Sequence, residues 1–236
     1  ALSADVAATC MVAGAHANGL VPGQLNKLVD PLAYVTTVRN TETSRLGADV
    51  ENDTSYRARI QLAPERFSVA GPAGAYRYHA LAAHQEIADV AVWCPTPGTV
   101  DVRPVMSGGE LPSGNILALV RERLNAEDVR PLTDTVIVAA PEPVEYTVSG
   151  GWYLHRDNAA LAASVTGKIE AAVEEYRLWQ RSAPGRDINP TRLIALLERA
   201  GAKRVELSSP TYRKLEKKEI ARETAITLTF MGVEDD

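Results

Sequence analysis

The side chains best suited to chemistry are few in this sequence and widely separated. The four histidines are His16, His79, His84 and His155. His79 and His84 are five positions apart, which on a helix turns them about 140° away from each other, whereas two ligands of one metal need a shared face. Cys10 and Cys94 have no CxxC spacing. They predict two free thiols instead of a disulfide framework or a zinc site.

Signatures of nucleophilic and nucleotide chemistry are absent as well. No GxSxG occurs, and the glycine-rich 107–109 and 149–151 lack the lysine that holds phosphate in a P-loop. The run 71–74 contains a proline and follows a predicted helix, whereas a dinucleotide site needs a preceding strand. Glu142 and Glu145 could flank a cleft, but solvation beside a joint also explains them. We expect no catalytic residue, no metal site and no cofactor.

The composition is that of a globular chain. Its 236 residues are 45% hydrophobic and 23% charged, and a chain of this length forms one large domain or two small ones. The net charge of −5 disfavours nucleic acid as the main partner, because proteins that bind it carry a basic surface. No apolar run reaches the roughly 18 residues of a membrane-spanning helix. With no convergent polar motif, the chain is more typical of an assembly component than of an enzyme.

The first part of the chain, residues 1–85, is predicted to be a β and helical module that is truncated upstream. Its Ala-rich start predicts a helix over 1–18. Apolar positions then indicate extended structure over 25–38, which Pro31 interrupts. The polar stretch 40–52 predicts a loop.

Two short helices are expected at the end of this module. Asp53 is a suitable N-cap for a helix that ends near Ala63, where Pro64 disturbs the next turn. The second helix is predicted over 73–84.

The rest of the chain predicts two further units. Residues 86–140 read as a ββαβ subdomain, and residues 141–236 as a βααββ subdomain. The expected elements are strands at 87–94 and 100–105, a helix capped by Ser113, a strand at 135–139, a strand bulged at Gly150-Gly151, a long helix from Asp157 or Asn158, a helix capped by Asn189 and stopped by Gly201, and strands near Val205 and over 226–230. The fold class is therefore predicted as α+β, with several small subdomains whose helices pack on small antiparallel or mixed sheets.

Two segments invite a mechanical interpretation. Pro141, Glu142 and Pro143 join the two later units, and we interpret them as a hinge, because proline restricts its own backbone and that of the preceding residue. The basic stretch 213–222 predicts a solvated loop or helix face. Contact with an acidic partner surface is the alternative.

The text of the sequence resembles one family. The stretch 67–81, FSVAGPAGAYRYHAL, is similar to the signature of baseplate J-like proteins, the wedge proteins of contractile-tailed phages and related contractile injection systems. Further similar segments are 22–25, 29–31, 87–90, 125–134, 141–146, 185–188 and 204–207. The resemblance runs from Gly19 to Leu207, and residues after Ser208 are not aligned. Family members usually carry a further N-terminal segment of several tens of residues, which we expect to be missing here.

The resemblance implies a structural role without enzymatic activity. Family members are wedge subunits that form a ring around the baseplate hub and transmit the contraction trigger. It implies a homo-oligomer, a dimer within the ring, together with other wedge subunits as partners, and neither nucleic acid nor membrane. It places the protein in the virion tail baseplate, after assembly in the cytoplasm of the bacterial host. The alternatives are a peripheral adaptor that attaches a fibre or effector, and a tail-associated hydrolase.

Four residues are candidates for the assembly interface. Tyr76, Arg77 and Tyr78 lie on the short helix after Gly71-Pro72, and Arg130 precedes a predicted strand. Aromatic and arginine side chains are enriched at interface centres, and arginine makes bidentate contacts with carboxylates. The competing interpretation is that Tyr76 packs internally and Arg130 forms an intrachain pair.

Overall fold

The computed structural model describes residues 3–67 and 71–235. The tripeptide 68–70 of the family-like signature therefore lies outside the described residues. The chain divides into two compact units, Ala1–Tyr56 and Arg57–Asp236, which are described separately.

The first unit has no helix over 3–18, so the predicted helix is wrong. Bonds to a distant segment replace helical ones: the Ala15 amide donates to Asp49 at 2.9 Å, and Asn18 exchanges two hydrogen bonds with Gly47. No described residue of this unit is buried. A helix without apolar surface to pack against is only marginally stable in water.

Residues 25–38 form no strand either. A turn interrupts them, in which the Leu32 carbonyl accepts a hydrogen bond from the Val35 amide at 3.2 Å. The predicted loop 40–52 is confirmed. It is held by Asn40, whose side chain donates to the Leu20 carbonyl and accepts from the Leu25 amide.

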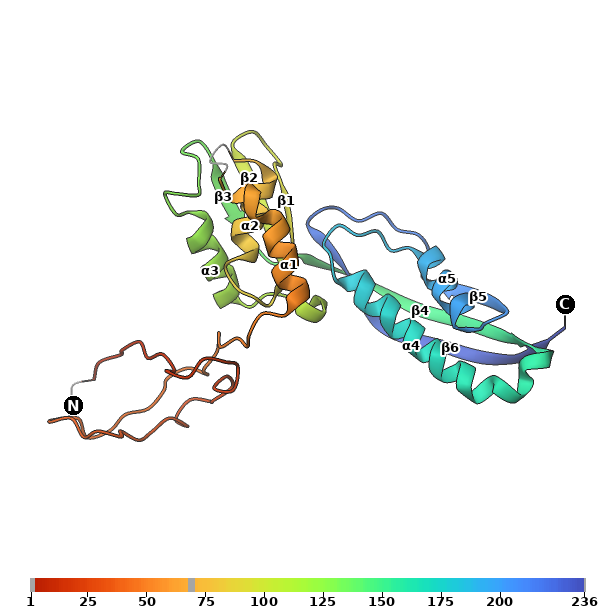
Figure 1. Ribbon diagram of the computed structural model, residues 1–236, viewed down its shortest axis with the longest axis horizontal. Helices are drawn as coiled ribbons and strands as arrows, with labels where there is room; N and C mark the ends of the chain where they lie inside the picture. Colours follow the sequence, from red (N-terminus) through yellow and green to blue (C-terminus); the bar gives the residue numbers. More distant parts are fainter. Residues whose placement is uncertain (1–2, 68–70, 236) are drawn as a thin grey trace. The chain divides into compact units, whose positions relative to one another are not determined.

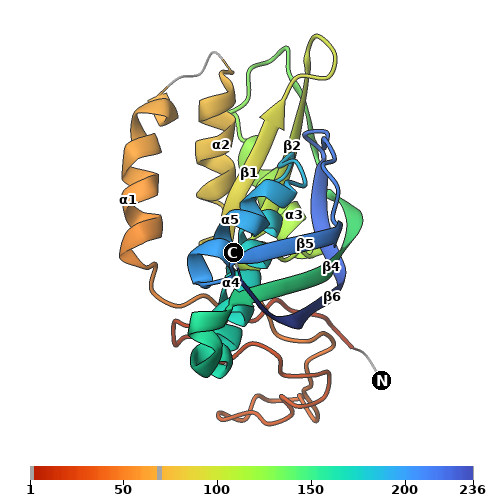
Figure 2. The same cartoon turned by 90° about the vertical axis from the view of Figure 1, so that its right-hand side faces the viewer.

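The second unit begins with a lobe built on a three-stranded sheet (Figures 1 and 2). Its elements are α1 (Asp53–Leu62), η1 (Ala63–Phe67), α2 (Ala73–Leu81), β1 (Ile87–Trp93), β2 (Thr99–Met106), η2 (Ser107–Gly109), α3 (Gly114–Leu124) and β3 (Thr135–Val138). Strand order is β1-β2-β3, antiparallel and then parallel. The first four residues of α1 belong to the preceding unit, and Asn52, one residue before the predicted cap, accepts the Thr54 and Ser55 amides.

The core of this central lobe follows the sequence pattern. Ser113 caps α3 as predicted, and Ile116, Val120 and Leu124 of that helix are buried at helical spacing. Tyr76 and Ala80 of α2 share the same buried cluster with β1 and β2. The division of the chain at residue 85, which separates α2 from that sheet, stays a prediction.

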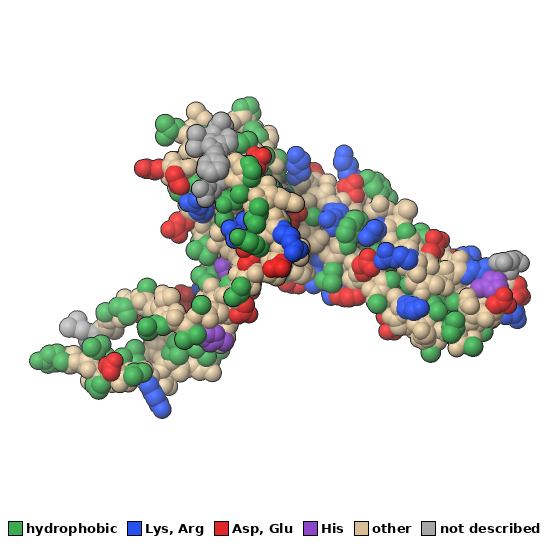
Figure 3. Space-filling view, viewed as in Figure 1, with side chains coloured by type: hydrophobic (Ala, Val, Ile, Leu, Met, Phe, Trp, Pro, Cys, Tyr) green, Lys and Arg blue, Asp and Glu red, His purple; other side chains and the backbone are tan. Residues whose placement is uncertain are grey.

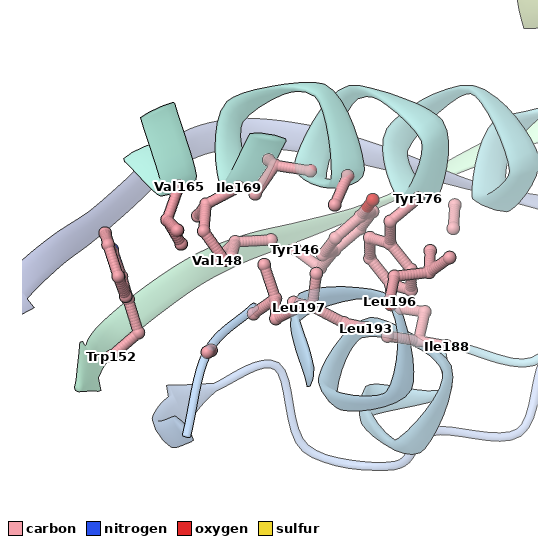
Figure 4. Packing of buried hydrophobic residues seen from close by; sticks show 14 of the residues in the cluster. Tyr146, Val148, Trp152, Val165, Ile169, Tyr176, Ile188, Leu193, Leu196 and Leu197 are labelled. Carbon is pink, nitrogen blue, oxygen red and sulfur yellow. The ribbon is translucent and has the colours of Figure 1, made fainter. Parts of the chain in front are cut away.

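The C-terminal lobe is a second three-stranded sheet with two helices. Its elements are β4 (Glu142–His155), η3 (Arg156–Leu161), α4 (Ala162–Arg181), α5 (Pro190–Ala200), β5 (Arg204–Ser209) and β6 (Glu219–Glu234). Strand order is β5-β4-β6; β5 pairs antiparallel to β4, and β6 pairs parallel to it. The helices cover the sheet face that carries Tyr146 and Val148 (Figure 4).

Several local predictions hold in this lobe. The β4–β5 register shifts between Ser149 and Gly150, Asn189 caps α5, and Gly201 ends that helix with φ 117°. Two predictions need correction. The long α-helix begins at Ala162, because residues 156–161 form a 3₁₀ turn, and the end of the basic stretch, from Glu219, is strand.

The fold class is α+β. The described residues contain five α-helices and two small mixed sheets of three strands each.

Candidate functional site

The candidate interface residues on α2 take part in contacts within the central lobe. Tyr76 is 2% exposed, and its hydroxyl donates to Asp134 Oδ2 at 2.8 Å. Burial and the neighbouring Asp134 carboxylate raise the pKa of Tyr76. Arg130 donates from Nη1 to the Asp134 carbonyl at 2.8 Å. Asp134 therefore joins α2 to the segment that enters β3.

The two residues after Tyr76 are held differently. Arg77 Nη1 donates to the Val90 carbonyl at 2.7 Å, and its Nη2 lies 2.5 Å from Asp89 Oδ1. Tyr78 is buried, and its ring meets His79 edge to face at 5.2 Å. Because the Tyr76 and Tyr78 rings are buried, they can support an interface only by fixing the position of α2. Arg77 and Arg130 are partly exposed and could contact a partner directly. The assignment of these four residues to an assembly interface stays a prediction.

The candidate hinge is the start of β4. Pro141 is buried, and Glu142 and Pro143 pair with Glu219 and Ile220 of β6. The Glu142 amide donates to the Lys218 carbonyl at 2.8 Å, and its carboxylate lies 3.1 Å from Lys218 Nζ. That carboxylate raises the pKa of Lys218. The segment is thus hydrogen-bonded to the C-terminal lobe. Its action as a hinge stays a prediction.

Arg103 holds the joint from the side of the central lobe. Its Nη1 donates to the Ala140 carbonyl at 2.8 Å, directly before Pro141. Its Nε and Nη2 donate to the two carboxylate oxygens of Asp101, at 2.7 and 3.0 Å. These bonds raise the pKa of Arg103, so its positive charge is fixed. The chain therefore crosses between the lobes through a bonded segment.

A second contact joins the lobes far from the joint in sequence. Gly109 has φ 74°, and a Cβ there would lie 2.5 Å from the Arg181 carbonyl oxygen at the end of α4. The next residue, Glu110, places its carboxylate 3.3 Å from Arg181 and 3.4 Å from Arg222. We call Gly109, Glu110, Arg181 and Arg222 the Glu110 contact.

The Glu110 contact continues into a charge cluster that is mostly shielded from water. Glu223 of β6 lies 3.0 Å from Arg177 and 3.3 Å from Arg181. The Arg181 and Glu223 side chains are only 12% and 11% exposed. Ion pairs shielded in this way are sensitive to the loss of one partner, which leaves the other charge buried. Within the C-terminal lobe the cluster holds Arg181 beside Glu223, in the place from which Arg181 contacts Glu110.

Sequence reasoning missed the Glu110 contact. Its partners are separated by as many as 112 positions, and each of the charges is unremarkable alone. The available signal is Ser107-Gly108-Gly109, which lacks the lysine of a phosphate loop but still indicates an unusual backbone conformation. Two adjacent glycines with positive φ mark a close backbone approach as readily as a ligand.

The described residues offer little reactive chemistry. Within 3–67 and 71–235, no group of three or more His, Cys, Asp or Glu side chains could hold a metal ion. No helix in the same ranges has both the length and the apolarity to cross a membrane. An open groove in the second unit is lined by Trp93, Asp101 and the basic loop 214–218. Positive and negative side chains are interspersed on the visible face of this unit (Figure 3).

Comparison with known families identifies the class of protein. The baseplate J-like barrel domain matches residues 1–47, the central domain matches 68–140, and the C-terminal domain matches 152–229. The chain belongs to the baseplate J-like family, whose members are structural and not enzymatic. The C-terminal match continues to residue 229, so the expectation that residues after Ser208 do not align with the family is wrong.

A curated relative agrees with this class. Baseplate protein J of Escherichia phage P2 is 39% identical over 167 residues, which are 69% of this chain and 53% of that protein. The chain thus spans about half the length of the curated relative it matches. A chain of the cryo-EM baseplate of the anti-feeding prophage is 17% identical, with TM-score 0.48, over 86% of this chain and 48% of that one.

Proposed function

We propose that this chain is part of a wedge subunit in the tail baseplate of a phage or phage-like contractile system. The carrying observation is the succession of three baseplate J-like domains along one chain, in the order of barrel, central and C-terminal domains. The 39% identity to a phage baseplate protein supports the same role. Such a subunit is assembled in the bacterial host cytoplasm and resides in the virion tail.

The proposal includes the partners and the mechanical role. The subunit joins other wedge proteins and a second copy of itself in a ring around the hub, and it transmits the contraction trigger. We propose three modules, residues 1–85, 86–140 and 141–236. Pro141–Pro143 is the hinge between the last two modules. Arg77 and Arg130 face a neighbouring subunit, and the buried Tyr76 and Tyr78 fix the helix and loop that carry them. Rotation of rigid units about such joints is an established way to switch assemblies.

A peripheral adaptor that attaches a fibre or effector is the second candidate. The observation that favours it is a free sheet edge that carries an exposed aromatic residue, Phe230 of β6. Extended peptides add to such edges in many recognition domains.

Light scattering distinguishes the two candidates. The purified chain is measured alone and after mixing with each product of the neighbouring genes. A dimer, or a stable complex with a second baseplate protein, supports the wedge subunit. A monomer that binds only a fibre or effector product supports the adaptor, and a monomer that binds none of these products contradicts both. Arg77→Ala with Arg130→Ala should weaken the wedge complex at least tenfold, while Arg156→Ala, in η3 directly after the far end of β4, should not.

A further inference from the structure

β6 presents an open edge that is unusual in its length. The strand has 16 residues and pairs with β4 along one side only (Figure 2). No strand of the described residues covers its other side. An uncovered edge displays a row of unpaired backbone donors and acceptors, which natural proteins usually protect.

Charged residues and proline, two common protections of such an edge, are missing from the middle of β6. Residues 224–233, TAITLTFMGV, contain neither a charged residue nor a proline. Natural edge strands are commonly interrupted by lysine, proline or inward-pointing charges, because apolar uncharged strands pair with one another. The middle of this edge, 225–230, is also regular, since the register shifts against β4 lie just outside it.

An apolar row runs along the same edge on the helix-covered face. Ile226, Leu228 and Phe230 stand opposite Val148, Gly150 and Trp152 of β4. The Phe230 ring lies 4.6 Å from that of Trp152, and Leu228 packs against the core cluster. Ile226 and Phe230 nevertheless remain 39% and 38% exposed. The core is therefore open at its β6 side, and a further strand there would cover it.

The sequence of β6 fits a second copy of itself as that strand. In an antiparallel pair centred on Leu228, Ile226 of each copy lies opposite Phe230 of the other. The same register places Arg222, which also contacts Glu110, opposite Glu234, which also contacts Arg204. Opposite charges in facing positions favour this register. A parallel in-register pair would instead set Glu223 and Glu234 against their own copies, which is unfavourable. Both arrangements match apolar residues with each other, and charge therefore selects the antiparallel one.

We propose that β6 is a self-association surface: two copies of this chain pair antiparallel through their β6 edges about a two-fold axis at Leu228. The two sheets then form one continuous six-stranded sheet, and each Phe230 covers the partner's Ile226. The inference deepens the self-association in the proposed function by naming its surface.

Site-specific cross-linking tests the register. In a background with Cys10→Ser and Cys94→Ser, which removes both exposed thiols, one cysteine is added and a short thiol cross-linker applied. Leu228→Cys should give a cross-linked dimer, because residues directly opposite have Cβ atoms about 5 Å apart. Ile226→Cys or Phe230→Cys alone should cross-link at least tenfold less, because four residues of offset separate the thiols by roughly 13 Å. A mixture of those two variants should cross-link again.

A charge substitution provides an independent test with a matched control. Ile226→Lys should weaken the dimer at least tenfold in light scattering. Ile137→Lys is the control, because Ile137 is a similarly exposed isoleucine, at 42%, on the edge strand β3 of the other sheet. The circular dichroism spectrum of each variant verifies folding.

The outcomes test the β6 surface and the wedge-subunit role separately. A dimer that persists without cross-linking at Leu228, or equal cross-linking of Ile226→Cys alone, overturns the β6 surface and leaves self-association standing. A monomer at every concentration overturns the β6 surface, and the mixing experiment then decides on the wedge role. Cross-linking of Leu228→Cys together with the loss caused by Ile226→Lys supports the inference.

Discussion

At the scale of single residues, tyrosine hydroxyls distinguish positions that look alike in the sequence. Tyr76 donates a hydrogen bond to a carboxylate, whereas the buried hydroxyls of Tyr146 and Tyr176 have no partner in the described structure. A buried polar group without a partner carries the cost of lost hydration, and one with a partner recovers it. Replacement by phenylalanine should therefore act in opposite directions.

Tyr76→Phe should lower the free energy of unfolding by about 1–3 kcal/mol, because it removes a bond to the charged Asp134. Urea denaturation measures this loss. Tyr78→Phe, on the same helix and also buried, serves as the control and should change stability by less than about 0.5 kcal/mol. Equal effects of the two substitutions would mean that the Asp134 bond contributes nothing specific.

Tyr176→Phe should leave the protein as stable as before, or more so, and should remove part of its alkaline sensitivity. Burial raises the pKa of Tyr176 to about 12, above the value near 10 expected in the unfolded chain. The unfolded state thus loses this proton first, so stability is full below pH 10 and declines between about pH 10 and 12.

Unfolding experiments at pH 9 and pH 11.5 give the comparison. The loss of stability between the two pH values should be smaller in Tyr176→Phe than in the wild type, by roughly 1–2 kcal/mol. Identical losses in both proteins would show that Tyr176 does not titrate in this range.

At the scale of elements, the glycine pair in β4 shows that a sequence pattern can predict a bulge but not the surroundings of each glycine. The sequence predicted a bulge at Gly150-Gly151, and the register shift is there. The two glycines nevertheless differ. A Cβ on Gly150 would collide with the backbone carbonyl of Glu206 in β5. One on Gly151 would crowd the Met231 side chain, 2.5 Å away, and would meet the Thr229 carbonyl oxygen only at an ordinary contact distance of 3.5 Å.

Gly150→Ala should therefore destabilise the protein by about 1–3 kcal/mol, because a strand must move to admit the methyl group. Gly151→Ala is the matched control and should cost less than about 1 kcal/mol, because a methionine side chain adapts easily. Thermal unfolding of both variants measures the difference. Equal costs would contradict the close approach of β5 at Gly150.

Much of the element scale was readable from sequence, and the failures share a cause. Helix α3 and its cap Ser113, helix α5 and its cap Asn189, and the central hairpin follow from local signals. The predicted helix over 1–18 failed because hydrogen bonds from the distant segment 44–49 replace helical ones. Local preference determines an element only where no distant partner competes for its backbone.

At the scale of the whole second unit, the lobes are tied by polar contacts. The joint is held by Arg103 on one side and by Lys218 on the other. The Glu110 contact adds an attachment in which the exposed Glu110 carboxylate pairs with the mostly shielded Arg181, beside a close backbone approach at Gly109. Polar attachments of this kind are typical of contacts between domains within one chain.

Gly109→Ala should uncouple the lobes, because its Cβ would collide with Arg181 in a backbone conformation that already disfavours alanine. Gly108→Ala is the control: its φ of 69° gives the same backbone strain, but the nearest atom, Arg181 Nη2, is 4.0 Å away. Gly108→Ala should cost about 1 kcal/mol, and Gly109→Ala should cost more.

The readout is the cooperativity of unfolding. In urea, Gly109→Ala should broaden the transition or divide it in two and reduce its m-value, whereas Gly108→Ala should only shift the midpoint. The same sharp transition in both variants would mean that the lobes are not coupled through Gly109.

At the candidate site, the sequence indicates which residues matter, and the tertiary structure shows what they contact. The sequence identified Tyr76, Arg130 and the proline joint as notable. Only the structure showed that Tyr76 and Arg130 converge on Asp134 and that Pro143 lies within a strand pair. Residue type gives what a side chain is able to do, but burial and partners decide which of those uses is realised.

The sequence by itself determined the fold class, because periodicity, caps and turns act within short stretches, and it indicated the family by the resemblance of segments such as 67–81. The tertiary structure alone decided which charges meet at the Glu110 contact, which glycines cannot be replaced, and which strand is left with an open edge. Those features depend on contacts between residues as many as 112 positions apart, and no local pattern specifies such contacts, because they form only when the separate elements have packed.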